Sequence, residues 1–386
     1  MNNSRINFDI EMLRGIAIVM VLFQHYPSLY FWSDHATFQW VSQYFTFWPG
    51  VDLFFCISGF VVGKTLIDKL DKNKDRGIST SPIIKDFFIK RIFRLLPTTI
   101  AWVLIVLFLS KHFNTSGAFG IFEENLKQAA SVLTYNYNLY VKHVNESGIP
   151  PTFAPFWSLN LEEQFYFIFP FFLLFCKKNM RLPVLITIIS ILFFIKRQGH
   201  LSFNFRIDAI SYGVILSILS SRDSYAFMKN KMKSRLNMPN ALLIFMILLL
   251  IIIPKMIWES SAMVGILAII CFITIYLASF NEQIITLPQP IRKILIYIGS
   301  RSYGLYLIHM PSIFITQEVF AQYFTSQRKL PHGGVLIDIS ITALSLLVTI
   351  ILVETNYHLI ENPFRKIGRQ IASKKNKESV TSFQAQ

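Results

Sequence analysis

Charged residues are scarce in this sequence. Asp, Glu, Lys and Arg together make up 15% of its 386 residues, whereas soluble domains carry about 25%. Hydrophobic residues make up 53%, and the mean hydropathy is +0.46. Apolar runs recur along the whole chain, and a helix needs roughly 20 mostly apolar residues to cross the hydrocarbon core of a bilayer. This composition excludes an ordinary soluble domain and favours a polytopic membrane protein.

Cysteine is also rare, and each of its three copies lies inside an apolar run. A disulfide framework needs cysteines in an extracytoplasmic, loop-rich context. We therefore expect small core side chains and no disulfide at these positions, which are Cys56, Cys176 and Cys271.

The net charge of +15 is distributed in a way that argues against a nucleic-acid surface. Nine basic residues lie within 64–94, and none lies within 29–46. Cytoplasmic loops of membrane proteins carry such an excess of Lys and Arg. The charge therefore reports membrane topology, and no nucleic-acid partner is expected.

The pattern predicts an all-α transmembrane bundle of about ten spans in a bacterial-type inner membrane, with both termini cytoplasmic. This threading places 26 Lys and Arg inside and 9 outside. Residues 1–366 form the transmembrane domain, Glu123–Tyr140 an interfacial helix outside, and 367–386 a polar tail that is expected to be disordered. The predicted spans are 9–29, 46–63, 94–111, 156–176, 182–196, 206–221, 240–257, 261–280, 294–316 and 335–356.

The first span contains two polar residues that an apolar helix does not need. Arg14 and His25 are eleven positions apart, which is about 1100° of helix turn and about 16 Å of rise. Both side chains therefore face nearly the same way. Glu11 lies three residues before Arg14 and can pair with it. A lone His is more often a core residue, but the co-facial arginine favours a functional site.

Other spans carry polar residues at membrane depth, where each is a functional hypothesis because its insertion is unfavourable. Asp52 follows Gly50, and helix packing explains the glycines Gly50 and Gly59 but not the aspartate. Arg91 and Arg94 are i,i+3 neighbours suited to a phosphate, although anionic lipid or topology explains them equally well.

The fourth and ninth spans each carry a polar face near the outer side. Ser158, Glu162 and Tyr166 lie at i, i+4 and i+8, and Ser302, Tyr306 and His309 share a helix face. We also expect Arg206 and Asp208 to pair at the outer end of another span. Arginines therefore gather at the cytoplasmic end of the predicted bundle, and residues capable of acid/base chemistry gather at its outer end. This arrangement suits the transfer of a chemical group across the membrane.

Five ordered motifs resemble the acyltransferase type-3 membrane family. They are Arg14-x10-His25, the run from Pro49 to Phe60 (PGVDLFFCISGF), Trp157–Tyr166 (WSLNLEEQFY), Ser302–His309 (SYGLYLIH) and Glu361–Arg365 (ENPFR). Any one of them is weak evidence, but together they cover residues 9–366 in the family's order.

The resemblance implies O-acylation, most often O-acetylation, of an extracytoplasmic glycan such as O-antigen lipopolysaccharide or exopolysaccharide. The donor substrate would be cytoplasmic acetyl-CoA, with no metal and no permanently bound cofactor. Longer relatives carry a fused hydrolase-like domain, which we expect to be absent here. The expected partners are acetyl-CoA, a glycan or lipid-linked glycan, and membrane lipid.

These inferences give each candidate residue a role. The catalytic set is His25, Arg14, Asp52 and Glu162; the donor-binding set is Arg14, Arg91, Arg94 and Arg365; the acceptor-binding set is Asp52, Trp157, Glu162 and His309. A transporter of a sugar, lipid-linked glycan or proton-coupled solute explains the buried carboxylates equally well. It explains the arginines less well, and the sequence shows no inverted repeat. A structural membrane partner in polysaccharide assembly would need no buried histidine.

Overall fold

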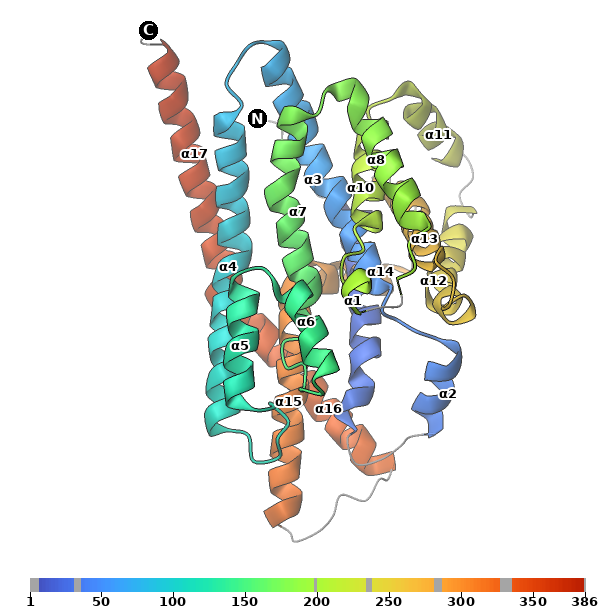
Figure 1. Ribbon diagram of the computed structural model, residues 1–386, viewed down its shortest axis with the longest axis vertical. Helices are drawn as coiled ribbons and strands as arrows, with labels where there is room; N and C mark the ends of the chain where they lie inside the picture. The colour runs from blue at the N-terminus through green and yellow to red at the C-terminus, as the bar shows by residue number, and fades with distance from the viewer. Residues whose placement is uncertain are drawn as a thin grey trace. The chain divides into compact units, whose positions relative to one another are not determined.

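The computed structural model describes residues 7–30, 36–197, 200–233, 238–280, 287–326 and 335–384. Within these ranges the chain forms helices and no strand (Figure 1), as the sequence predicts. Among the described residues, three helices are long and apolar enough to cross a membrane: α3 (Gly50–Asp75), α4 (Ser81–His112) and the continuous helix Leu336–Ser373. The count of ten spans and the cytoplasmic termini remain predictions.

Most of the other predicted spans coincide with one helix each. These helices are α1 (Phe8–His25), α7 (Phe156–Phe175), α8 (Lys178–Phe193), α10 (Asp208–Leu219), α12 (Met238–Met256) and α13 (Met263–Ser279). The predicted span 335–356 coincides with α16 (Val335–Asn356), the first part of the long helix Leu336–Ser373.

Two predicted helices are each divided in the structure. The span 294–316 is interrupted at Arg301, between α14 (Gln289–Ser300) and α15 (Ser302–Ser326). The Ser300 hydroxyl donates to the Tyr297 carbonyl at 2.7 Å, a local bond that competes with helix continuation. Similarly, Glu123–Tyr140 forms α5 (Phe122–Leu133) and α6 (Tyr137–Glu146), because Tyr135 adopts a left-handed backbone with φ of 57°.

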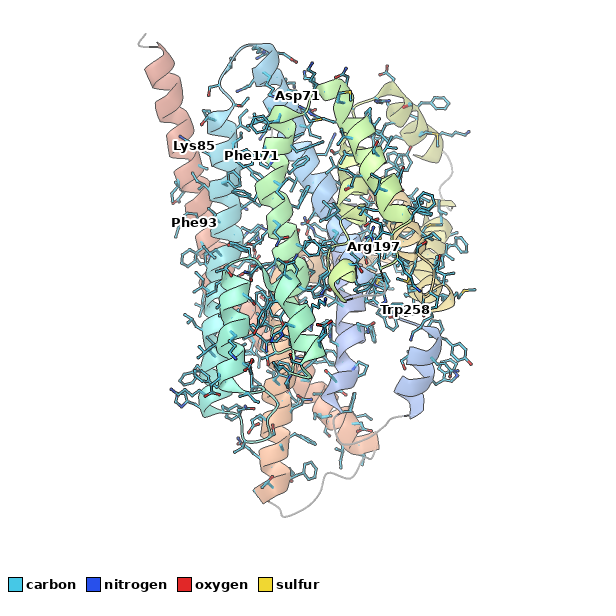
Figure 2. The ribbon with its side chains drawn as sticks, in the orientation of Figure 1. Asp71, Lys85, Phe93, Phe171, Arg197 and Trp258 are labelled. Carbon is cyan, nitrogen blue, oxygen red and sulfur yellow. The ribbon has the colours of Figure 1, made fainter. Side chains whose placement is uncertain are left out.

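The described part of the C-terminal stretch is helical. A π-helical segment, η2 (Tyr357–Glu361), joins α16 to α17 (Asn362–Gln384), and α17 includes residues 367–384. α17 lies alongside α4 (Figure 1). Phe93 of α4, which is labelled in Figure 2, is a neighbour of Gly368 in α17. A helix that is already formed extends at little free-energy cost, so packing of its first half supports the polar second half.

The helices form two compact units, each drawn from separated stretches of the chain. The first unit comprises Met1–Pro27, Asp34–Thr65 and Phe175–Ser302. The second comprises Ser28–Ser33, Leu66–Leu174 and Tyr303–Gln386. Each unit is described by itself below.

In the first unit, glycines allow helices to meet backbone to backbone. A Cβ added to Gly299 of α14 would lie 1.9 Å from the Glu11 carbonyl oxygen of α1, and one on Gly15 would lie 2.2 Å from the Leu295 carbonyl oxygen. The same holds for Gly59 of α3, where an added Cβ would lie 2.1 Å from the Ile210 carbonyl oxygen. The predicted packing role of Gly59 is therefore confirmed, and the Gly15 and Gly299 contact fixes the helix that carries Arg14.

We expect Gly299→Ala to destabilise the protein, because its methyl group would push α14 away from α1 at a backbone atom that cannot yield. Overpacking of this kind typically costs about 1–3 kcal/mol. Thermal denaturation of the detergent-solubilised protein measures the effect. Gly304→Ala is the matched control, since its nearest neighbour would lie at 3.4 Å, an ordinary contact. Equal melting temperatures for the two variants would contradict the close packing of α1 on α14.

Candidate active site

One group of predicted site residues lies on α1, in the first unit. This helix is unbroken from Phe8 to His25, so Arg14 and His25 are separated by about 16 Å along one axis. The Arg14 guanidinium donates to the Glu11 carboxylate at 2.6 Å, which confirms the predicted i,i+3 pair. His25 is half-buried at the C-terminal end of α1. Next to it, the Gln24 side chain accepts the backbone N–H of Phe47 at 2.8 Å.

Asp52 belongs to a fully buried ion pair. Arg206 donates from Nε to the Asp52 carboxylate at 2.9 Å, and the two side chains are 0% and 2% exposed. Asp208 instead receives a bidentate contact from Arg197, at 2.6 and 2.9 Å. The predicted pairing of Arg206 with Asp208 is therefore wrong. Each arginine has its own aspartate, and the two aspartates are close enough to interact electrostatically.

Two aromatic rings contact Arg206 in this group of four charges. The Arg206 guanidinium lies 4.5 Å from the Trp48 ring centre and 4.0 Å from that of Phe203, a cation–π arrangement that stabilises a desolvated arginine. Arg197 is labelled in Figure 2 and was not predicted from the sequence. The sequence contained one indication of this role. Arg197 directly follows a predicted span and lies at the same predicted membrane depth as Asp208. The burial of Asp52 suits a structural role better than direct contact with an acceptor.

The second unit brings the two predicted outer polar faces together. The hydroxyl groups of Ser158 on α7 and Tyr306 on α15 lie 2.5 Å apart. The Tyr306 ring packs against His309 with centroids 5.9 Å apart. His309 is fully buried, and its Nδ1 lies 3.1 Å from the Leu305 carbonyl oxygen. Trp157 packs against the neighbouring apolar core of this unit.

The two adjacent carboxylates of α7 face different partners. Glu162 accepts a short hydrogen bond from the Tyr166 hydroxyl, and the Arg91 guanidinium lies 4.4 Å from the Tyr166 ring centre. Glu163 instead accepts a hydrogen bond from Tyr135 and lies within electrostatic range of Tyr303. Consecutive helix residues point about 100° apart. The two glutamates therefore contact different residues although they are adjacent in the sequence.

Tyr303 continues this polar group toward the predicted cytoplasmic side. Its hydroxyl lies 3.0 Å from Thr99 Oγ1 and donates to the Leu95 carbonyl at 2.8 Å. The Trp102 indole N–H donates to the Asn356 side chain at 3.1 Å. Asn356 is the residue that precedes the π-helical segment η2. Roles for Tyr303, Thr99 and Asn356 were not predicted from the sequence, because neutral polar side chains are common in packed transmembrane helices.

At the predicted cytoplasmic end, the second unit gathers positive charge. Arg365 donates to Glu361 at 3.1 Å, and Arg94 and Arg369 are close enough to Arg365 to interact electrostatically. The Nε of Arg94 is buried without a hydrogen-bond partner among the described residues. π-helical turns occur frequently at functional sites, and this one carries Glu361. Three arginines with one nearby carboxylate form a site suited to an anionic group.

Comparison with known proteins identifies the family of this chain. A family model described as "Acyltransferase domain" matches residues 7–354. The chain is 26% identical to the peptidoglycan O-acetyltransferase OatA of Listeria monocytogenes over 387 residues, and 27% identical to the putative O-acetyltransferase SACOL0978 of Staphylococcus aureus over 383 residues. The putative peptidoglycan O-acetyltransferase YrhL of Bacillus subtilis is 25% identical over 403 residues.

The chain belongs to this acyltransferase family, whose members are membrane proteins. Each of the three alignments covers 93% of this chain, but only 56%, 57% and 55% of the respective relative. The chain therefore spans little more than half the length of these relatives. None of the solved structures matches it.

Proposed function

We propose that this protein is a membrane O-acetyltransferase that moves an acetyl group from acetyl-CoA to a hydroxyl group of an extracytoplasmic glycan. The observation that carries the proposal is the unbroken helix α1, which holds Arg14 and His25 about 16 Å apart on nearly the same face. Family membership and the printed names of the O-acetyltransferase relatives support the reaction type.

Arginine is well suited to the donor, because its planar guanidinium binds phosphate oxygens in pairs. We place a phosphate of the donor on Arg14, from which an extended arm of about 16 Å brings the thioester to His25. The arginine cluster of the second unit, Arg94 with Arg365, provides a further phosphate-binding site. Arg91 lies over an aromatic ring, so its share in donor binding is expected to be smaller.

His25 acts as the general base in this mechanism. Neutral imidazole takes the proton from a glycan hydroxyl, whose oxygen attacks the thioester carbonyl carbon. The new C–O bond forms as the C–S bond breaks, and the leaving CoA thiolate takes up the proton, so the products are the acetyl ester and CoA. Histidine is the side chain most often used as a general acid or base.

The acceptor is proposed to be a polysaccharide of the cell envelope. Peptidoglycan, named for two of the relatives, joins O-antigen lipopolysaccharide and exopolysaccharide as a candidate. Glu162, Trp157 and His309 of the second unit are the proposed acceptor contacts. Asp52 is proposed to stabilise the helices of the first unit through its ion pair with Arg206.

The proposal is tested with purified protein in nanodiscs, acetyl-CoA labelled in its acetyl group, and each candidate polysaccharide. We expect the label to appear as an alkali-labile ester on one of these glycans, with one CoA released per acetyl group transferred. Absence of labelled ester on all of them would contradict the proposed activity and favour a transport function. NMR of glycans from a deletion strain and its parent would identify the modified hydroxyl.

We expect Arg94→Gln to raise the KM for acetyl-CoA by about 10- to 100-fold, equivalent to about 1.4–2.7 kcal/mol. Arg94 is a clean probe because no carboxylate pairs with it among the described residues, so its removal leaves no buried negative charge behind. Steady-state kinetics at saturating glycan measure the change. Lys85→Gln, an exposed cation on the same helix, is the control. An unchanged KM would remove Arg94 from the donor site.

A further inference from the structure

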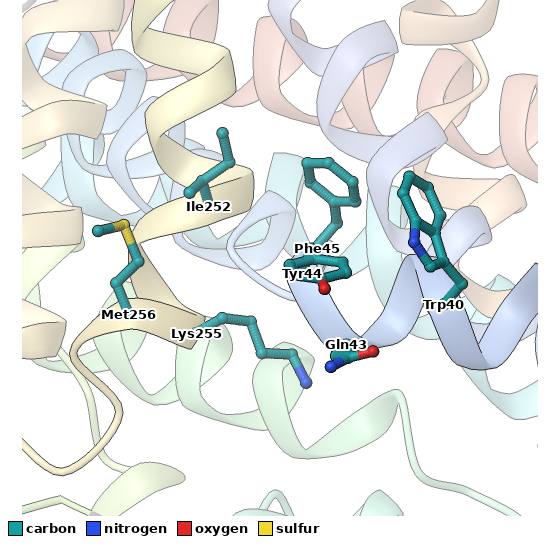
Figure 3. A pocket seen from close by; sticks show the side chains of 7 residues that line it. All are labelled: Trp40, Gln43, Tyr44, Phe45, Ile252, Lys255 and Met256. Carbon is teal, nitrogen blue, oxygen red and sulfur yellow. The ribbon is translucent and has the colours of Figure 1, made fainter.

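An aromatic pocket lies in the first unit, between the end of α2 (Ala36–Tyr44) and the last turn of α12 (Figure 3). Its volume is about 580 Å³, within the range of about 300–1,000 Å³ that is typical of small-molecule sites. The backbone N–H of Thr46 donates to the Ile251 carbonyl at 3.0 Å, so the two walls are joined. By the predicted topology, both walls lie at the outer membrane surface.

One wall of the pocket presents aromatic rings to the solvent. The Trp40 ring lies 5.6 Å from that of Tyr44 and 6.3 Å from that of Phe45. Trp40 is 58% and Tyr44 50% exposed, so much of each ring remains uncovered by the protein. Flat, rigid rings of this kind provide a large contact area for a ligand at a low conformational-entropy cost.

The rim of the pocket is polar and positively charged. The side chains of Gln43 and Lys255 extend toward each other at one edge, as Figure 3 shows. No carboxylate pairs with Lys255 in the part of the chain that the structure describes. Aromatic residues alone could anchor the protein at the membrane interface. Anchoring at the interface requires no pocket. It also does not require the Gln43 amide and the Lys255 ammonium group to face each other at the edge of a pocket.

We infer that this pocket is an accessory binding subsite for one sugar ring of an anionic acceptor glycan. A pyranose ring has an apolar C–H face and hydroxyl groups at its edge, which match the aromatic wall and Gln43. Lys255 would bind a carboxylate or phosphate on that sugar or its neighbour. The inference rests on the proposed function, because it takes the acceptor to be a glycan. It adds a preference for negative charge and a contact away from the transfer site.

The test measures glycan binding without turnover, using full-length His25→Ala protein in nanodiscs of neutral lipid and no acetyl-CoA. The probes are an acidic hexasaccharide of alternating N-acetylglucosamine and glucuronate, and the neutral hexasaccharide of N-acetylglucosamine. Isothermal titration should show saturable binding that is tighter for the acidic probe. Trp40→Ala should weaken binding of both probes by about tenfold, and Trp40→Phe by much less. Lys255→Gln should abolish only the preference for the acidic probe.

Two controls match the position and chemistry of these variants. Trp258→Ala removes an exposed tryptophan near the same end of α12 that packs against Phe203, and Lys196→Gln removes an exposed lysine that pairs with Glu259. Both should leave binding unchanged.

The inference is overturned if neither hexasaccharide binds, or if Trp40→Ala binds as tightly as the parent. It is also overturned if anionic phosphatidylglycerol in the nanodisc competes for the pocket, because the site would then hold a lipid headgroup. Binding does not require acetyl transfer, so a failed binding assay leaves the proposed activity standing. Conversely, Trp40-dependent binding without any labelled ester in the transfer assay would count against the proposed activity alone.

Discussion

Replacing His25 with alanine is expected to lower acetyl transfer by at least about 100-fold while the protein remains folded and inserted in the membrane. General bases typically contribute about 10²- to 10⁴-fold to a reaction rate. The substitution removes the imidazole from the last turn of α1 and makes the helix more apolar, so insertion should not suffer. Ester formation per mole of folded protein, with acetyl-CoA and glycan both saturating, measures the loss.

Two further variants separate proton transfer from other roles of this residue. His25→Gln keeps a hydrogen-bonding side chain but cannot serve as a base at neutral pH, so it should be as inactive as His25→Ala. His112→Ala, at the exposed end of α4, should retain full activity. If His25→Gln retained a substantial fraction of the parent's activity, His25 would be a positioning residue and the base would have to be sought elsewhere.

The sequence predicted those parts of the site that depend on a single helix. Helical periodicity alone placed Glu11 beside Arg14, and it placed Tyr306 next to His309. These contacts follow from 3.6 residues per turn and do not depend on which helices are neighbours. The helical fold class was predicted for the same reason, because long apolar segments satisfy their backbone hydrogen bonds internally.

Partners on different helices could not be predicted in this way. Hydropathy gives the depth of Asp52, Arg206 and Asp208, but not which helices pack together or how each is rotated. The sequence therefore paired Arg206 with its neighbour Asp208, whereas Arg206 contacts Asp52 and Arg197 takes Asp208. Glu163 was passed over for Glu162 because its partner, Tyr135, lies in a turn whose left-handed backbone the sequence did not reveal.

The buried ion pair leads to the second large expected effect, which concerns folding. Asp52→Leu and Arg206→Met should each sharply reduce the amount of folded protein, because each single change leaves an uncompensated charge in a buried site. Breaking a buried pair from one side costs about 3–5 kcal/mol, whereas replacing both partners by apolar residues is often neutral or stabilising. The double variant Asp52→Leu/Arg206→Met should therefore recover folded protein to near the parent's level. Size-exclusion chromatography and melting temperature in detergent give the three comparisons.

Acetyl transfer by the double variant then decides what Asp52 does. If the Asp52 carboxylate serves to pair with Arg206, the folded double variant should transfer acetyl groups at a rate within about fivefold of the parent's rate. This factor corresponds to about 1 kcal/mol. Arg197 and Asp208 remain as a balanced pair in that variant, so the local charge stays neutral. A double variant that folds and melts like the parent but forms no ester would show that Asp52 takes part in the reaction itself. The complete burial of Asp52 beside Arg206 favours the first outcome, because a reacting hydroxyl group needs access to the carboxylate.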